Sequence, residues 1–184
     1  MSMRAIIAAL FAALLLAAPV AAQTKDVSFG GDTFVKKFEG SKNTADIFIE
    51  FGLPPEPIEK WTKLFVFHAQ PGGGNDPMRA AANLAKVLKS HDKNAPLRII
   101  ENKANGEVII DFLTSAKDSD TVEFDIFKFT RAADGKGLVA AQYAYRFTLG
   151  DVDGGELSKI RQRAINGMAG FDMAAVKDYF ANAH

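Results

Sequence analysis

The chain contains no cysteine among its 184 residues. A sequence without cysteine cannot form a disulfide, bind a metal through thiolates, use a thiol nucleophile or carry a lipid on a cysteine. Neither sign of charge is in excess, because 22 basic residues are balanced by 22 acidic ones. Nucleic-acid and anionic-membrane binders normally carry a clustered positive excess, so we expect neither kind of partner.

Long apolar runs are confined to the first 22 residues. Arg4 precedes an almost wholly apolar run over residues 5–18, and small residues follow at positions 20–22. This order is typical of a secretory signal peptide, whereas a membrane anchor would need about 20 uninterrupted apolar residues. We expect cleavage after Ala22 and a secreted or periplasmic product without stable membrane insertion.

The remaining chain has the size of one domain. Residues 23–31 are polar with two glycines, and we interpret them as a flexible lead-in. Residues 32–184 are predicted to form a single globular domain, whose core would come from the 15 phenylalanines and the many aliphatic side chains.

Apolar periodicity predicts an α+β fold. Segments that favour strands are Thr33–Phe38, Ala45–Phe51, Trp61–Ala69, Leu97–Asn102, Glu107–Thr114, Thr121–Thr130 and Leu138–Leu149. Segments that favour helices are Pro77–Ser90, Glu156–Met168 and Asp172–Ala181. Strands followed by helices indicate a single antiparallel sheet of about six strands with helices packed on it.

Two loops flank the strand that starts at Trp61. The first contains Pro55 between two further prolines and has a restricted shape, and the second is a glycine run centred on Gly73. Fixed and flexible loops beside an aromatic residue can frame a pocket. We therefore name Trp61, His68, Pro55 and Gly73 as candidate residues for ligand or partner contact.

The three histidines show no metal-binding or catalytic motif. His91 is predicted to end a helix and His184 ends the chain, while His68 lies near the end of an interior strand without a partner that the sequence identifies. A general acid or base needs such a partner within reach. The sequence therefore assigns no catalytic residue, no metal ligand and no cofactor.

A pair of carboxylates is the strongest chemical candidate. Glu123 and Asp125 share one face of a strand, so their side chains start about 7 Å apart. This separation is compatible with acid–base chemistry such as glycoside hydrolysis. We favour cross-strand charge pairing over this chemistry, with Arg146 in another strand segment as the candidate partner.

The octapeptide Pro57–Leu64, with its Glu-x-Trp-Thr-x-Leu element, resembles small secreted bacterial proteins of unknown function. In the order of its elements, from Ala45 to Phe180, the chain is similar to the PsbP/Mog1-type α/β sandwich. This resemblance implies an antiparallel sheet between helices and a binding or accessory role, and it transfers no catalytic residue.

Three functions remain open at this point. We favour a soluble accessory or binding protein of the cell envelope, without catalytic activity, whose protein or small-molecule partner is unknown. The first alternative is a hydrolase that uses His68 or the Glu123 and Asp125 pair. The second is a carrier of small apolar ligands, which would need an internal cavity lined by phenylalanines.

Overall fold

The computed structural model describes residues 25–41, 46–115 and 119–181. The predicted signal peptide and His184 lie outside these ranges. The strands are β1 (Val27–Phe29), β2 (Asp32–Ser41), β3 (Ile47–Gly52), β4 (Lys63–Gln70), β5 (Leu97–Asn102), β6 (Glu107–Ser115), β7 (Thr121–Arg131) and β8 (Leu138–Thr148). The helices are α1 (Pro77–His91), α2 (Gly154–Gly170) and α3 (Ala174–Ala181), with a short 3-10 turn at Ile58–Lys60.

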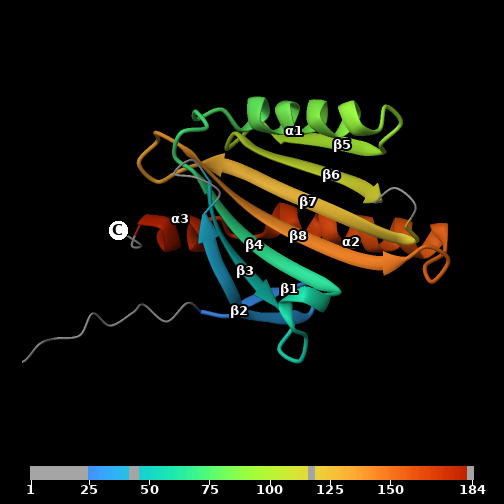
Figure 1. Ribbon diagram of the computed structural model, residues 1–184. Helices are drawn as coiled ribbons and strands as arrows, with labels where there is room; N and C mark the ends of the chain where they lie inside the picture. Colours follow the sequence, from blue (N-terminus) through green and yellow to red (C-terminus); the bar gives the residue numbers. More distant parts are fainter. Residues whose placement is uncertain (1–24, 42–45, 116–118, 182–184) are drawn as a thin grey trace, which may run out of the picture.

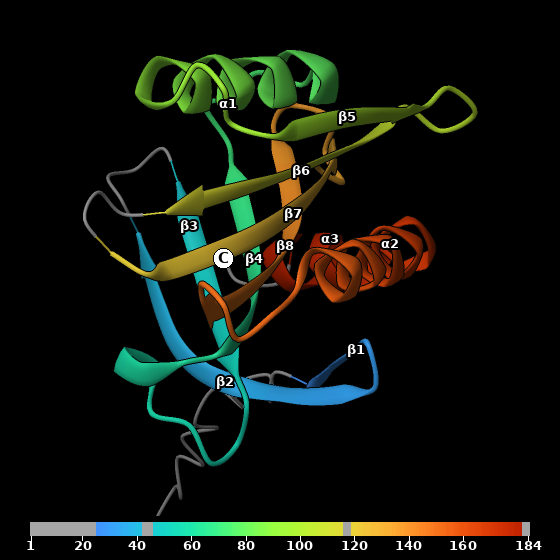
Figure 2. The ribbon, with the colours of Figure 1, turned by 90° about the vertical axis from the view of Figure 1, so that its right-hand side faces the viewer.

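All eight strands form one antiparallel sheet in the order β1-β2-β3-β4-β8-β7-β6-β5. Two four-stranded meanders are therefore joined where β4 pairs with β8 (Figure 1). The sheet curls around α2 and α3 like half a barrel, and α1 lies on its outer face (Figure 2). The predicted six-stranded sandwich of PsbP/Mog1 type is wrong, because the sheet has eight strands and is strongly curved.

The strand that the sequence analysis did not anticipate is β1. It lies within the segment assigned to a lead-in, where Val27 and Phe29 alternate with polar residues and are buried. Gly30 and Gly31 both have positive φ, at 63° and 91°, and form a two-residue turn that pairs Phe29 with Asp32. Such a turn needs φ above zero at both central positions, which glycine supplies without strain.

The concave face of the sheet holds the main core. Its side chains pack against α2 and α3, and the largest of them are fully buried, namely Phe34, Phe51, Phe65 and Phe124. Phe65 lies at the centre, with its ring centroid 5.2 Å from that of Phe29 and 5.0 Å from that of Phe171. Buried phenylalanines therefore form much of this core, whereas Phe38 is 48% exposed.

Polar contacts stabilise both ends of α2, and one of them attaches the helix to the sheet. Asp153 caps the start of the helix by accepting hydrogen bonds from the backbone of Gly155 and Glu156. At the other end, the buried Lys128 amine donates to the carbonyl oxygens of Ala169 and Phe171. A cation at the last carbonyls of a helix complements its dipole, so both ends of α2 are stabilised.

The convex face is covered only in part. Helix α1 packs its apolar stripe on β5, β6 and β7, around the fully buried Ala81 and Ile110. Within the described ranges, no helix is both long enough and apolar enough to cross a bilayer. The part of the convex face formed by β3, β4, β8 and the start of β7 carries the polar side chains described next.

Candidate functional site

A groove of about 260 Å³ lies on the convex face of the sheet. Its apolar floor is formed by Leu64, Val66 and Ala144, with Phe48 and Trp61 packed at the sides. The polar side chains around this floor belong to four neighbouring strands and to the residue before β3, and they are Asp46, Glu50, His68, Glu123 and Gln142.

The register of the strands explains why these residues meet. Val66 of β4 lies opposite Gln142 of β8, and Glu123 of β7 lies opposite Arg146 of β8. Side chains two residues apart in a strand share a face, so His68 lies beside Gln142 and Asp125 beside Glu123. The groove is thus built from residues far apart in the sequence.

A chain of hydrogen bonds connects His68 to the carboxylate pair. The His68 Nε2 atom is 2.8 Å from Gln142 Oε1, and Gln142 Nε2 donates to Asp125 Oδ1 over 2.7 Å. Because the Gln142 amide nitrogen faces the carboxylate, its oxygen must accept from His68, which places a proton on Nε2. His68 Nδ1 then faces Asp46 Oδ1 at 4.0 Å.

The carboxylate pair is held by an arginine that stacks on the tryptophan. Arg146 Nη2 lies 3.1 Å from Glu123 Oε2, and its guanidinium carbon lies 3.7 Å from the centre of the Trp61 ring. The predicted pairing of Glu123 with Arg146 is therefore confirmed. Glu56 fixes the loop before Trp61 by accepting hydrogen bonds from both the backbone nitrogen and the hydroxyl of Thr62, at 2.7 and 2.6 Å.

Asp125 titrates near neutrality. Burial, which leaves this residue 3% exposed, is the main cause that raises its pKa from 3.8 to about 7. The adjacent Glu123 charge raises the pKa further, whereas the hydrogen bond from Gln142 lowers it. A buried carboxyl beside a second carboxyl retains its proton, because two negative charges so close together repel.

Asp46 offers an acceptor that the described part of the chain leaves unused. Its Oδ1 atom is buried, and none of the described residues donates a hydrogen bond to it. A buried acceptor without a donor is costly. The groove can therefore accept hydrogen bonds from a bound molecule at this atom.

The structure brings together four of the residues singled out from the sequence and separates the other two. Trp61, His68 and Glu123 line the groove, and Asp125 lies beneath them. Pro55 is exposed in the loop before Trp61, and Gly73 follows the opposite end of β4. Gly73 therefore lies away from the groove.

Sequence reasoning missed Asp46 and Gln142, which connect the other groups. Neither residue belongs to a motif, and strand alternation is the only signal that places Gln142 on the face of Arg146. Within the described ranges, no three His, Asp or Glu side chains are arranged to hold a metal ion.

An apolar recess of about 480 Å³ bears on the carrier alternative. It lies at the end of the sheet beside α3, and residues such as Ala69, Val139 and Phe180 line it. Among the described residues that line it, Phe180 is the only phenylalanine, so this recess differs from the phenylalanine-lined internal cavity that the carrier would need.

Comparison with known proteins establishes a family. A protein-family model matches residues 21–173, which is most of the chain, and the chain belongs to that family. The match brings no named function, and it does not link the chain to the PsbP/Mog1 type. No curated protein matches the sequence.

Proposed function

We propose that the protein is a non-catalytic binding protein of the cell envelope and that the groove on the convex face is its binding site. The convergence of Trp61, His68 and the carboxylate pair in one hollow supports this function. The signal-peptide pattern of residues 1–22 supports an envelope or secreted location. Recovery of the envelope protein with Gln23 as its first residue would support this location, and retention of the first 22 residues would contradict it.

The charges around the groove favour a ligand that carries an ammonium or guanidinium group. Asp46, Glu50 and Glu123 line it, and Asp125 adds a fourth carboxyl beneath them. No lysine or arginine is among the described residues that line the groove, and the nearby Arg146 already pairs with Glu123. The buried Asp46 Oδ1 atom accepts no hydrogen bond from the described residues and is therefore available to a donor on the ligand. The groove volume of about 260 Å³ suits a small amine or the side chain of a basic residue in a partner.

Titration with agmatine tests this function. Agmatine has one ammonium and one guanidinium group, and glutarate, an anion of similar length, serves as the control ligand. The fluorescence of Trp61, the only tryptophan, reports occupancy of the groove. We expect agmatine to bind and glutarate not to bind, and agmatine to bind more tightly at pH 8 than at pH 6, because Asp125 ionises near pH 7.

A matched pair of variants locates the binding. Glu123→Gln removes a charge that lines the groove, whereas Glu59→Gln removes one from an exposed position outside it. We expect agmatine affinity to fall about tenfold in the first variant, the effect of losing one charge-assisted contact, and to remain unchanged in the second. Equal affinity in both variants, or equal binding of agmatine and glutarate, would contradict the proposal.

A second candidate function is acid–base hydrolysis. The raised pKa of Asp125 favours it, because this carboxyl can hold a proton near neutral pH, as a general acid must, and lies beside a second carboxyl. The shortest test compares hydrolysis of a panel of aryl glycosides and aryl esters by the wild type and by Asp125→Asn. Turnover that disappears in Asp125→Asn supports the hydrolase, and turnover that persists excludes Asp125 from catalysis.

A further inference from the structure

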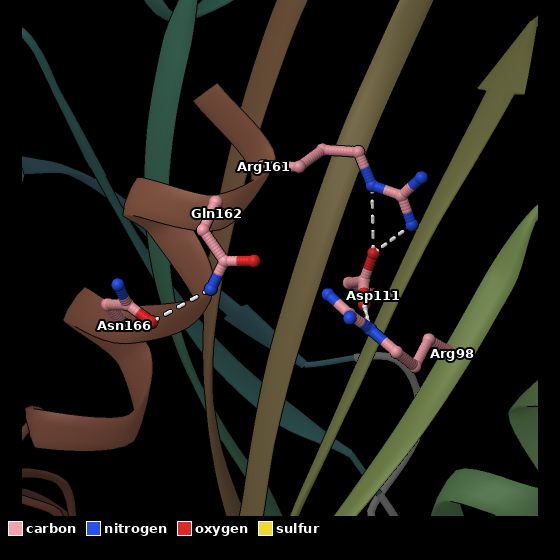
Figure 3. A network of polar contacts seen from close by, with 5 residues as sticks. All are labelled: Arg98, Asp111, Arg161, Gln162 and Asn166. Carbon is pink, nitrogen blue, oxygen red and sulfur yellow. Dashed lines mark hydrogen bonds and ion pairs between the residues drawn. The ribbon is translucent and has the colours of Figure 1, made fainter. Parts of the chain in front are cut away.

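A second polar cluster lies on the concave face, where α2 covers β6 and β7. Asp111 of β6 is fully buried and contacts two arginines (Figure 3). Arg161 of α2 directs its Nε and Nη2 atoms to Asp111 Oδ1, with Nε at 3.0 Å. Arg98 of β5 directs its Nε atom to Asp111 Oδ2 at 3.3 Å.

This cluster carries more positive charge than its carboxylate can neutralise. One carboxylate faces two guanidinium groups, and arginine stays protonated at every physiological pH. Asp111 engages three of the arginine nitrogens, whereas each guanidinium has five N–H donors, so both groups retain donors for another acceptor.

The remaining donors border an open space of about 420 Å³ between β5 and α2. Its lining residues are Arg98, Gly154, Leu157, Ser158, Arg161 and Gln162, none of which is acidic. The side chain of Arg98 is 50% exposed and that of Arg161 is 25% exposed, so a soluble ion can reach both. Asp111 holds the two guanidinium groups in place before any ligand arrives, which reduces the entropy lost on binding.

We propose that this space is an anion site, and that it binds the phosphate group of a small phosphomonoester or of a lipid head group. A tetrahedral oxyanion offers acceptors in several directions, so it can bridge two guanidinium groups that approach from different sides. The Ser158 hydroxyl adds a further donor on the α2 wall. This site is separate from the groove and does not depend on the function proposed for it.

Calorimetric titration of the purified chain tests the site, with inorganic phosphate as the probe and chloride at matched ionic strength as the reference. Arg98→Gln is the main variant, because Arg161 still pairs with Asp111 when Arg98 is removed. Ser158→Ala leaves both arginines in place. Lys159→Gln is the matched control, since this lysine lies on α2 with 71% exposure and does not line the space.

We expect phosphate to bind the wild type and Lys159→Gln equally, Arg98→Gln to bind at least about tenfold more weakly, and Ser158→Ala to show a smaller loss. Glycerol phosphate and vesicles that contain phosphatidic acid then distinguish the two sources of the phosphate group. Binding of either one that requires Arg98 supports the site. Absence of binding by all three probes, or equal affinity of the wild type and Arg98→Gln, overturns it.

Discussion

Replacement of Asp125 by asparagine is expected to stabilise the protein at alkaline pH and to have little effect in acid. In the folded state burial and Glu123 raise the pKa of Asp125 to about 7, whereas its ordinary value is 3.8. Between these two values the folded protein holds a proton that the unfolded chain releases. Stability therefore falls as pH rises from about 4 to about 7.

The size of this effect follows from the difference between the two pKa values. Each unit corresponds to about 1.4 kcal/mol, so the difference between 3.8 and about 7 amounts to about 4 kcal/mol above neutrality. Asparagine cannot ionise, and its side-chain oxygen can still accept the hydrogen bond from Gln142. The variant should therefore gain up to about 4 kcal/mol over the wild type at pH 8 and almost nothing at pH 4.

Urea unfolding followed by circular dichroism at a series of pH values provides the measurement. Asp151→Asn serves as the control, because this exposed carboxylate lies outside the groove. Titrating groups that do not interact with Asp125 contribute equally to the wild type and the variant and cancel in the difference, whereas Glu123 interacts with Asp125 and is part of the effect measured. A stability difference between Asp125→Asn and the wild type that stays constant between pH 4 and pH 8 would refute the assignment of a neutral carboxyl in the groove.

Three further destabilising substitutions, with Phe38→Ala as a control, test the fold by their effect on the urea midpoint. Phe65→Ala should destabilise by about 3–5 kcal/mol because its ring fills the core, whereas Phe38→Ala, at a position 48% exposed, should change stability by less than about 1 kcal/mol. Lys128→Ala should destabilise by about 3 kcal/mol, because the Lys128 Nζ atom lies 2.9 Å from Glu107 Oε2 and its removal leaves this carboxylate without its partner. Asp153→Ala removes the cap of α2 and should destabilise by about 1 kcal/mol, with reduced helical signal. An unchanged midpoint in any of the three destabilising variants would contradict the contact assigned to it.

Local patterns anticipated most individual elements but not the number of strands. Seven of the eight strands and all three described helices lie in segments that periodicity identified, because alternation and helix caps are local signals. The remaining strand, β1, is not predicted because Gly30 and Gly31 favour a flexible segment. Two adjacent glycines between short alternating segments also predict a tight hairpin, and this second interpretation is the correct one. The curvature of the sheet, which distinguishes this fold from a flat sandwich, arises from the pairing of all eight strands. No short segment of the sequence carries a pattern that predicts it.

The sequence anticipated some members of the candidate site, namely Trp61, His68, Glu123 and Asp125, but not Asp46 or Gln142 and not the contacts between them. Period-two alternation placed Glu123 and Asp125 on one face, and the position opposite Arg146 followed once the register was known. The contact between His68 and Gln142 joins residues that are 74 positions apart. Such a pairing depends on which strands become neighbours, so no inspection of the residues around His68 could reveal its partner.

The junction of β4 with β8 also has a consequence for how the molecule is made. Each half of the sheet can assemble from neighbouring segments as they emerge. The second edge of β4, at residues 63–70, stays unpaired until residues 138–145 of β8 have been made. Pairings between distant segments slow folding, because the entropy of closing a long loop is lost before the stabilising contacts form. During that delay the unpaired edge of β4 is exposed, and a nascent chain in this state is vulnerable to self-association or in need of a chaperone.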